Sequence, residues 1–118
     1  MADKSLITRR ALMVAAPAVA LAGPVAAETE TPVAALFREW REYYAWLNGP
    51  ATRGIDNEDF DKLSDRLTDM EDRIIRTPAK GAQDVLMQVI AYTGYGDGGL
   101  PDLAAAPDFW AEARALVA

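Results

Sequence analysis

One apolar pattern constrains the fold of this chain more than any other feature of its sequence. Between residues 57 and 77, apolar side chains recur at alternating spacings of three and four, at Phe60, Leu63, Leu67, Met70 and Ile74. This spacing places them along one seam of an α-helix, as at the a and d positions of two heptads. Because such a seam is buried against another helix, we predict an all-α fold built around a helical hairpin.

Capping signals bound the two helices of this hairpin. Thr31 followed by Pro32 is typical of an N-cap and a first helical position, and apolar residues at helical spacing continue to Leu47. We predict one helix over about 32–48, ended by a left-handed cap at Asn48-Gly49-Pro50. The seam helix is predicted over about 57–77, with Asp56 as its N-cap.

Two shorter helices complete the predicted bundle. The segment over about 81–93 is expected to end at Gly94; its β-branched residues also allow a strand, but its length favours a helix. One side of it carries Ala82, Val85, Leu86, Val89 and Ile90. After a glycine-rich turn, Pro107 opens a short C-terminal helix over about 107–117. The residues of that helix expected to cover the core are Phe109, Trp110, Ala113, Leu116 and Val117.

The first 27 residues differ in composition from the rest of the chain. Residues 1–10 carry three basic residues against one acidic residue, and residues 11–27 carry no charge. A basic region followed by an apolar region is typical of a cleavable export signal, and small residues place the cleavage site after Ala27. The alternative is a membrane-spanning anchor, but the apolar run is short and is interrupted by two prolines.

Within this segment, Thr8 to Val14 resembles the twin-arginine export signal: a hydroxyl residue, Arg9 and Arg10, then a large apolar pair. Leu12 and Val14 depart from the residues most common in that family, which leaves the general secretory route as the alternative. The resemblance implies that the translocase reads the two arginines. It also implies a bacterial protein that is periplasmic or secreted after cleavage and meets the membrane only through its signal segment.

Residues 28–118 form the second predicted part, a small acidic helical domain. Removing the signal takes away three bases and one acid from 12 and 18, which leaves 9 bases, 17 acids and a net charge of −8. That charge repels phosphate backbones, so no binding to nucleic acid is expected. The chain has no Cys and no His, which excludes thiolate nucleophiles, Cys/His zinc sites and serine–histidine catalysis. We therefore expect neither enzyme activity nor a cofactor.

Several motif-like stretches indicate chemistry only weakly. The glycines of Gly94–Gly99 have dinucleotide-motif spacing, but a helix precedes them and Pro101 follows, so a flexible connection is expected. Asp56–Asp61 begins like a calcium loop but lacks the required Gly and final Glu. The remaining carboxylate sets are expected to be solvated surface: the line Asp61, Asp65 and Asp69, and the pair Glu39 and Glu42.

Aromatic residues gather in the first predicted helix, at Phe37, Trp40, Tyr43, Tyr44 and Trp46. Most of them are expected to face the seam helix as core. Trp46 falls outside the apolar arc, and we expect it to pack beneath the glycine-rich turn and the last helix, or alternatively to stay exposed as an interface anchor. Trp40, Tyr43 and Trp46 are the candidate interface residues.

Three stretches of the domain resemble segments of small exported bacterial proteins: Leu36-Phe37-x-x-Trp40, Asp65–Ile74 and Pro78–Asp84. The likeness spans most of residues 33–93, and it implies no activity and no catalytic residues. We expect a non-catalytic helical module that binds a protein partner or a second copy of itself. The alternative is an accessory subunit exported together with a twin-arginine-dependent redox enzyme.

Overall fold

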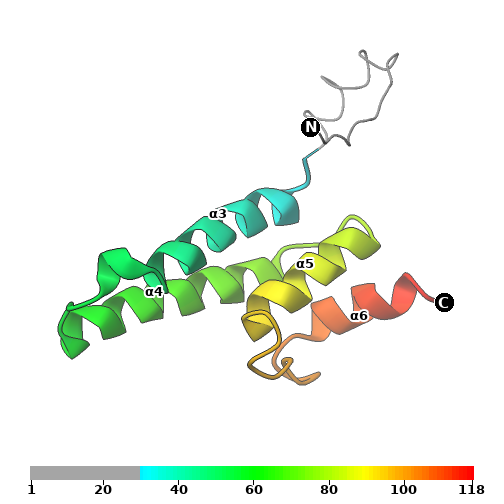
Figure 1. The fold of residues 1–118 in the computed structure, drawn as a ribbon. Helices are drawn as coiled ribbons and strands as arrows, with labels where there is room; N and C mark the ends of the chain where they lie inside the picture. The colour runs from blue at the N-terminus through cyan, green and yellow to red at the C-terminus, as the bar shows by residue number, and fades with distance from the viewer. Residues whose placement is uncertain (1–29) are drawn as a thin grey trace, which may run out of the picture. The chain divides into compact units, whose positions relative to one another are not determined.

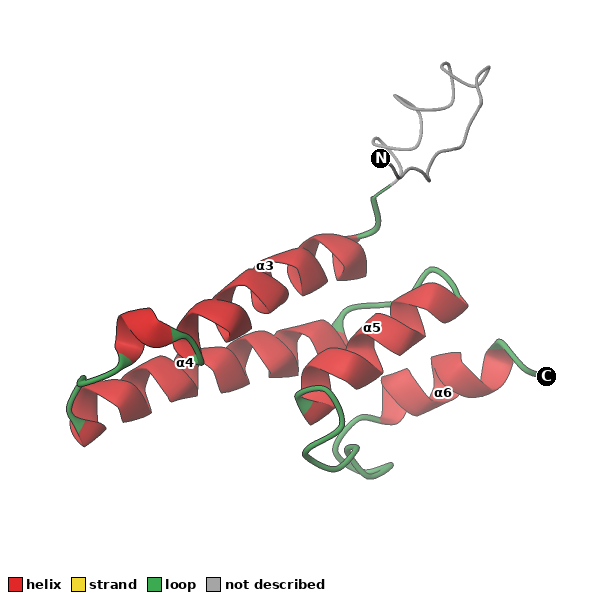
Figure 2. Ribbon diagram, in the orientation of Figure 1, coloured by secondary structure: helices red, strands yellow, loops and turns green. Residues whose placement is uncertain are grey.

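The predicted hairpin is the central element of the structure, a computed structural model that describes residues 30–118 (Figure 1). Within those residues the chain is all helical (Figure 2). The elements are α3 (Pro32–Leu47), the 3-10 turn η2 (Pro50–Thr52), α4 (Asn57–Arg76), α5 (Ala82–Thr93) and α6 (Pro107–Ala115). The predicted signal segment, with Arg9, Arg10 and Ala27, lies outside the described residues.

The helices pack as a hairpin covered at one end by two shorter helices. α3 and α4 lie side by side, α5 packs against both, and α6 contacts α4 and α5 (Figure 1). The predicted all-α class and its order of helices are therefore confirmed. Because α6 ends at Ala115, Leu116 and Val117 do not cover the core as expected, and they are 46% and 85% exposed.

The predicted helix starts are confirmed at the level of single hydrogen bonds. The Thr31 hydroxyl accepts from the backbone N–H of Ala34 at 3.0 Å, and the Asp56 carboxylate accepts from that of Asp59 at 2.9 Å. Each bond satisfies an amide that has no partner within its helix, and such a cap typically contributes about 1 kcal/mol. The predicted end of the third helix is also confirmed, because α5 ends at Gly94, which adopts the left-handed conformation with φ of 59°.

The predicted left-handed cap at the end of α3 is wrong. Asn48 has φ of −96° and Gly49 has φ of −99°, so neither is left-handed. The end of α3 is satisfied instead by Thr52, which is buried and whose hydroxyl donates to the Leu47 carbonyl at 2.7 Å. A Cβ at position 49 would lie 3.0 Å from the Ala45 carbonyl oxygen, so any other residue there would require a small shift of the backbone.

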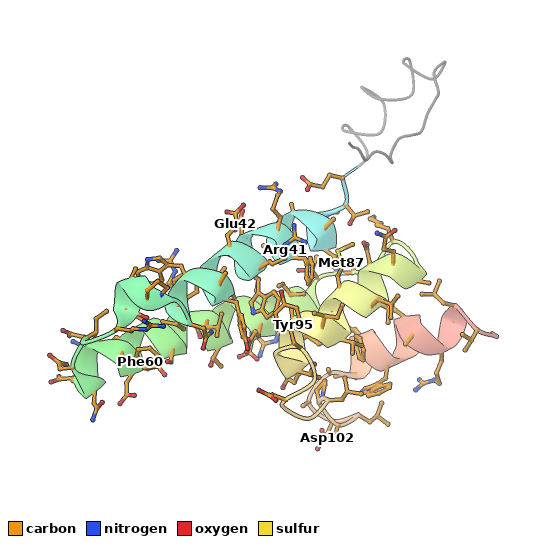
Figure 3. The ribbon with its side chains drawn as sticks, viewed as in Figure 1. Arg41, Glu42, Phe60, Met87, Tyr95 and Asp102 are labelled. Atoms are coloured by element: carbon orange, nitrogen blue, oxygen red, sulfur yellow. The ribbon has the colours of Figure 1, made fainter. Side chains whose placement is uncertain are left out.

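Two apolar clusters form the core, and neighbouring isoleucines of α4 belong to different ones. Ile74 lies in a cluster shared by α3, α4 and α5, whose other buried members are Val33, Trp40 and Ala91. Ile75 lies in a cluster with Ala106 and Phe109, packed against α5 and the start of α6. Leu67 and Met70 of the predicted seam pack against the first cluster, whereas Phe60 lies at the far end of α4 (Figure 3).

The inward face predicted for α5 is only partly right. Leu86 is 61% exposed and Ala82 is also exposed, whereas Asp84 and Gln88 are buried. One flank of α5 packs against the first cluster and the other flank packs against the second. The face between these flanks therefore meets the end of α4, where backbone groups require polar partners.

Asp84 and Gln88, two of the buried polar side chains of α5, serve backbone or capping groups. The Gln88 amide nitrogen donates to the carbonyls of Ile74 and Thr77 at 3.1 and 2.8 Å, which satisfies the end of α4. The Asp84 carboxylate accepts from the Thr31 hydroxyl at 2.7 Å and from the Lys80 backbone N–H at 2.8 Å. Asp84 thus fastens the start of α3 to the loop before α5.

Candidate functional site

Trp40, predicted as an interface residue, is part of the core. Its side chain is fully buried, and its ring lies 5.5 Å from that of Phe37 and 5.1 Å from that of Tyr44. Its indole N–H donates to a carboxylate oxygen of Glu71 at 3.0 Å. The interface prediction is wrong for Trp40 because the packing of α3 on α4 and α5 leaves none of this ring at the surface.

The glycine-rich segment is a hydrogen-bonded turn that packs Tyr95 onto the aromatic core. The backbone N–H of Tyr95 donates to the Ile90 carbonyl at 2.9 Å, and that of Gly98 donates to the Thr93 carbonyl at 2.8 Å. Tyr95 has φ of 62°, a conformation that costs a non-glycine residue about 1–2 kcal/mol. Its ring lies 5.2 Å from both the Trp40 and Tyr44 rings, and contacts of this kind offset that cost.

Trp46 does not pack beneath this turn, so the expectation that it is covered is wrong. It is 43% exposed, and its ring lies 5.6 Å from that of Tyr43. Tyr43 is half-buried, and its ring is held in place because its hydroxyl donates to the Leu63 carbonyl of α4 at 2.8 Å. The Arg66 guanidinium lies over the Tyr43 ring at 5.3 Å, close enough for a cation–π contact.

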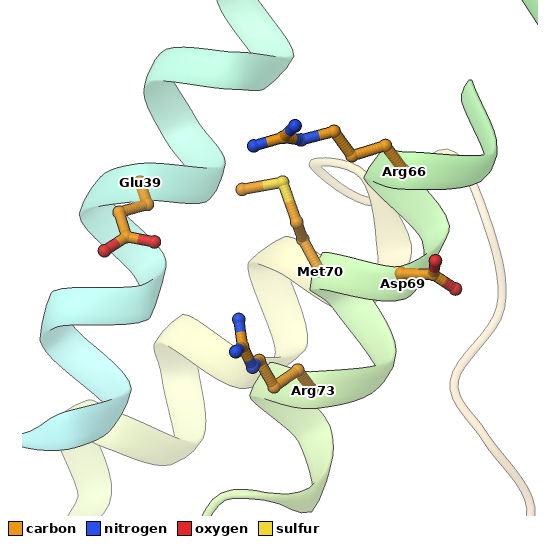
Figure 4. A pocket seen from close by; sticks show the side chains of 5 residues that line it. All are labelled: Glu39, Arg66, Asp69, Met70 and Arg73. Atoms are coloured by element: carbon orange, nitrogen blue, oxygen red, sulfur yellow. The ribbon is translucent and has the colours of Figure 1, made fainter. Parts of the chain in front are cut away.

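Next to these rings, α3 and α4 enclose a hollow of about 290 Å³. Figure 4 shows Arg66, Met70 and Arg73 reaching from α4 toward α3, while the Asp69 carboxylate turns away. Glu39 lines the hollow from α3. We call the combined surface the α3–α4 face; it consists of Glu39, Tyr43 and Trp46 from α3 and Arg66, Met70 and Arg73 from α4.

Sequence reasoning missed the α4 half of this face, although a signal for it was present. Arg66, Met70 and Arg73 follow one another at spacings of four and three, so they share a stripe of the helix. The predicted apolar seam includes Met70 but neither arginine. Apolar spacing does not indicate that the two flanking arginines converge on one hollow, so the sequence does not predict this convergence.

Two of the predicted acidic surface groups, Glu39 and Asp69, line the hollow. Asp61, Asp65 and Asp69 are exposed, as expected, and so are Glu39 and Glu42. In the part of the chain that the structure describes, no three acidic side chains come together to hold a metal ion.

A second hollow, of about 250 Å³, lies where Ile75 and Arg76 meet residues 105–109. None of the helices within residues 30–118 is long and apolar enough to cross a membrane.

The environment of Glu71 changes the proton affinity of its carboxyl group. Partial burial raises the pKa of Glu71 above its ordinary value, and the negative charge of Asp72 raises it further. The hydrogen bond from Trp40 opposes these effects because it stabilises the charged carboxylate. Among residues 30–118, the hydrogen-bond donor to this carboxylate is the indole N–H of the core residue Trp40, so the role of Glu71 is to satisfy that N–H.

Glu71→Gln is expected to stabilise the fold near neutral pH, because the amide oxygen still accepts from Trp40 without a half-buried charge. The raised pKa means that folding favours the protonated form of Glu71. The wild type should therefore lose stability relative to the variant as the pH rises above about 4.5 and through the raised pKa of the folded state. Urea unfolding of both proteins between about pH 3.5 and pH 7 measures this difference. A stability difference that does not change with pH would contradict the assignment.

No family model, curated protein or solved structure matches this chain. The function of the candidate site is therefore inferred from the geometry of its residues. That geometry joins a half-exposed indole, a fixed tyrosine, a flexible thioether and two guanidinium groups on one surface.

Proposed function

We propose that this chain is an exported, non-catalytic interaction module whose contact surface is the α3–α4 face. The observation that carries the proposal is Trp46, which stays 43% exposed while its neighbour Tyr43 is held by a hydrogen bond to α4. A large ring that already packs against a fixed neighbour loses less conformational entropy when a partner covers it.

The composition of the face supports the same function. Trp, Tyr, Arg and Met are the residue types enriched in protein–protein contacts, and binding energy concentrates on such anchors. The absence of Cys and His from the sequence removes the most common nucleophiles and proton-transfer groups. The carboxylate of Glu39 on this face is exposed, and the half-buried Glu71 accepts a hydrogen bond from Trp40, an arrangement that favours a contact surface over a catalytic site.

Site-specific photo-cross-linking tests this function in the full chain. A photoreactive phenylalanine at position 46 is expected to give a cross-linked product of defined mass in cells. The matched control places it at Leu103, which is 58% exposed and lies outside the α3–α4 face. Light scattering of the purified protein separates a foreign partner from a second copy. Equal products from both positions, or none from position 46, would refute the proposed contact surface.

Export is the second part of the proposal, and it is supported by the basic and apolar order of residues 1–27. The exported protein is expected to begin at Glu28, as determined by mass spectrometry. Replacing Arg9 and Arg10 together with lysine is expected to block export if the twin-arginine route is used. Lys4→Arg is the control, because it preserves the charge of the segment outside the arginine pair. Unchanged export of the double variant would assign the chain to the general secretory route.

A further inference from the structure

Two arginines on the α3–α4 face project toward the same hollow. Arg66 and Arg73 are seven residues apart on α4, and their side chains flank Met70 on the side that faces α3 (Figure 4). Both are exposed and Met70 is half-buried, so the hollow has an apolar floor with cationic groups at its two ends. A guanidinium carries five N–H donors in a plane that matches a carboxylate.

The surrounding charges leave these donors available. Within residues 30–118, no side-chain hydrogen bond or ion pair engages the Arg73 guanidinium, and Arg66 is engaged through the Tyr43 ring. Asp69, one turn before Arg73, is turned away from it (Figure 4). Acidic residues outnumber basic ones by 17 to 9 in residues 28–118. This excess of carboxylates favours an ion pair for each arginine, yet neither guanidinium beside the hollow has one within residues 30–118.

The hollow is continuous with the aromatic part of the face. Arg66 both lines the hollow and lies over Tyr43, and the Tyr43 ring contacts Trp46. A ligand that reaches both parts therefore needs an anionic group for the arginines and an apolar group for the exposed indole. Glu39, on the α3 side, supplies an acceptor for a backbone N–H of that ligand.

We propose that the hollow of the α3–α4 face binds an acidic peptide segment of a partner protein. One carboxylate lies between Arg66 and Arg73, and a neighbouring apolar side chain covers Trp46. This inference rests on the proposed function and adds the chemistry of the partner to it. A short acidic segment brings only a few negative charges, which the two arginines meet locally. A second copy of the chain brings a net charge of −8 and is therefore disfavoured by repulsion between the two domains. Nucleic acid is disfavoured because it brings a negative charge at every phosphate along its length.

Three short peptides test the proposed chemistry: acetyl-Leu-Glu-Glu-Leu-amide and the same sequence with Gln or with Lys at both central positions. The readout is the NMR resonance of the Trp46 indole N–H. The Glu peptide is expected to shift this resonance saturably at millimolar concentration, and to bind at least about 10-fold more tightly than the Gln or Lys peptide. Equal binding of the three peptides, tighter binding of the Lys peptide, or no saturable shift overturns the proposal.

Paired arginine variants separate a local site from general electrostatics. Arg66→Gln with Arg73→Gln is expected to weaken binding of the Glu peptide about 10-fold or more. The control is Arg53→Gln with Arg76→Gln, which changes the net charge equally at exposed positions outside the hollow. Its effect should be within about 2-fold, and equal weakening by both pairs overturns the site.

Cross-linking at position 46 distinguishes failure of this inference from failure of the proposed function. A specific cross-link that persists in the Arg66→Gln, Arg73→Gln variant overturns the acidic-segment assignment and leaves the interaction function in place. Loss of that cross-link in the variant supports the assignment, because this change removes the guanidinium groups while Trp46 is retained. If neither the cross-link nor peptide binding occurs, both proposals fail together.

Discussion

Trp40→Ala is expected to lower the free energy of unfolding by about 3–5 kcal/mol, the usual cost of removing a large buried ring. The ring contacts Phe37, Tyr44 and Tyr95 within 5.5 Å, so its loss leaves a cavity lined by other aromatic side chains. Domains of this size are typically stable by about 5–15 kcal/mol, so much of the stability should be lost. The variant also removes the donor to the half-buried Glu71.

Urea unfolding followed by helical circular dichroism measures this loss. Trp46→Ala is the matched control on the same helix; because Trp46 is 43% exposed, we expect its cost to be below about 1 kcal/mol. Trp40→Phe keeps most of the ring and removes the N–H, so it separates packing from the hydrogen bond to Glu71. Comparable losses for Trp40→Ala and Trp46→Ala would disprove the assignment of Trp40 to the core.

Gln88→Glu should have the second large effect, a loss of about 3–5 kcal/mol near neutral pH. The Gln88 side chain is fully buried, and its amide nitrogen lies 3.1 and 2.8 Å from the carbonyl oxygens of Ile74 and Thr77. A carboxylate oxygen in its place would face two acceptors and carry an unpaired buried charge. Protonation supplies one donor and removes the charge, so the variant should regain stability as the pH falls.

Gln83→Glu is the control for this prediction. It makes the same chemical change on the same helix at an exposed position, where we expect a change within about 0.5 kcal/mol. Urea unfolding of both variants at neutral and at acidic pH provides the comparison. If Gln88→Glu were tolerated at neutral pH, or if its stability did not recover in acid, Gln88 would not be the buried cap of α4.

The sequence predicted the helices well because their ends carry local signals. Thr31 with Pro32, Asp56 and Gly94 each specify a backbone conformation through their own side chain or lack of one, and each acts as predicted. The end of α3 was predicted incorrectly because its partner is the hydroxyl of Thr52, five residues beyond Leu47. The local pattern Asn48-Gly49-Pro50 contains no information about this contact, because Thr52 lies outside it.

Contacts between helices could not be predicted in the same way. Apolar periodicity placed Leu86 inside and left Asp84 and Gln88 outside, whereas the structure has the reverse. Polar residues are buried there because Thr31 and the carbonyls at the end of α4 require partners, and those groups are distant in sequence. The α3–α4 face escaped prediction for a related reason: it depends on which arginines an adjacent helix leaves unpaired.

The separation of the two core clusters has a consequence for shortened forms of the chain. Every buried member of the first cluster lies between Val33 and Ala91, so a chain cut near residue 100 keeps all of them. The second cluster also needs Ala106 and Phe109, which such a chain lacks. Ile75 would then have no cover from α6, and the shortened protein would be partly folded, with one core complete and the other open.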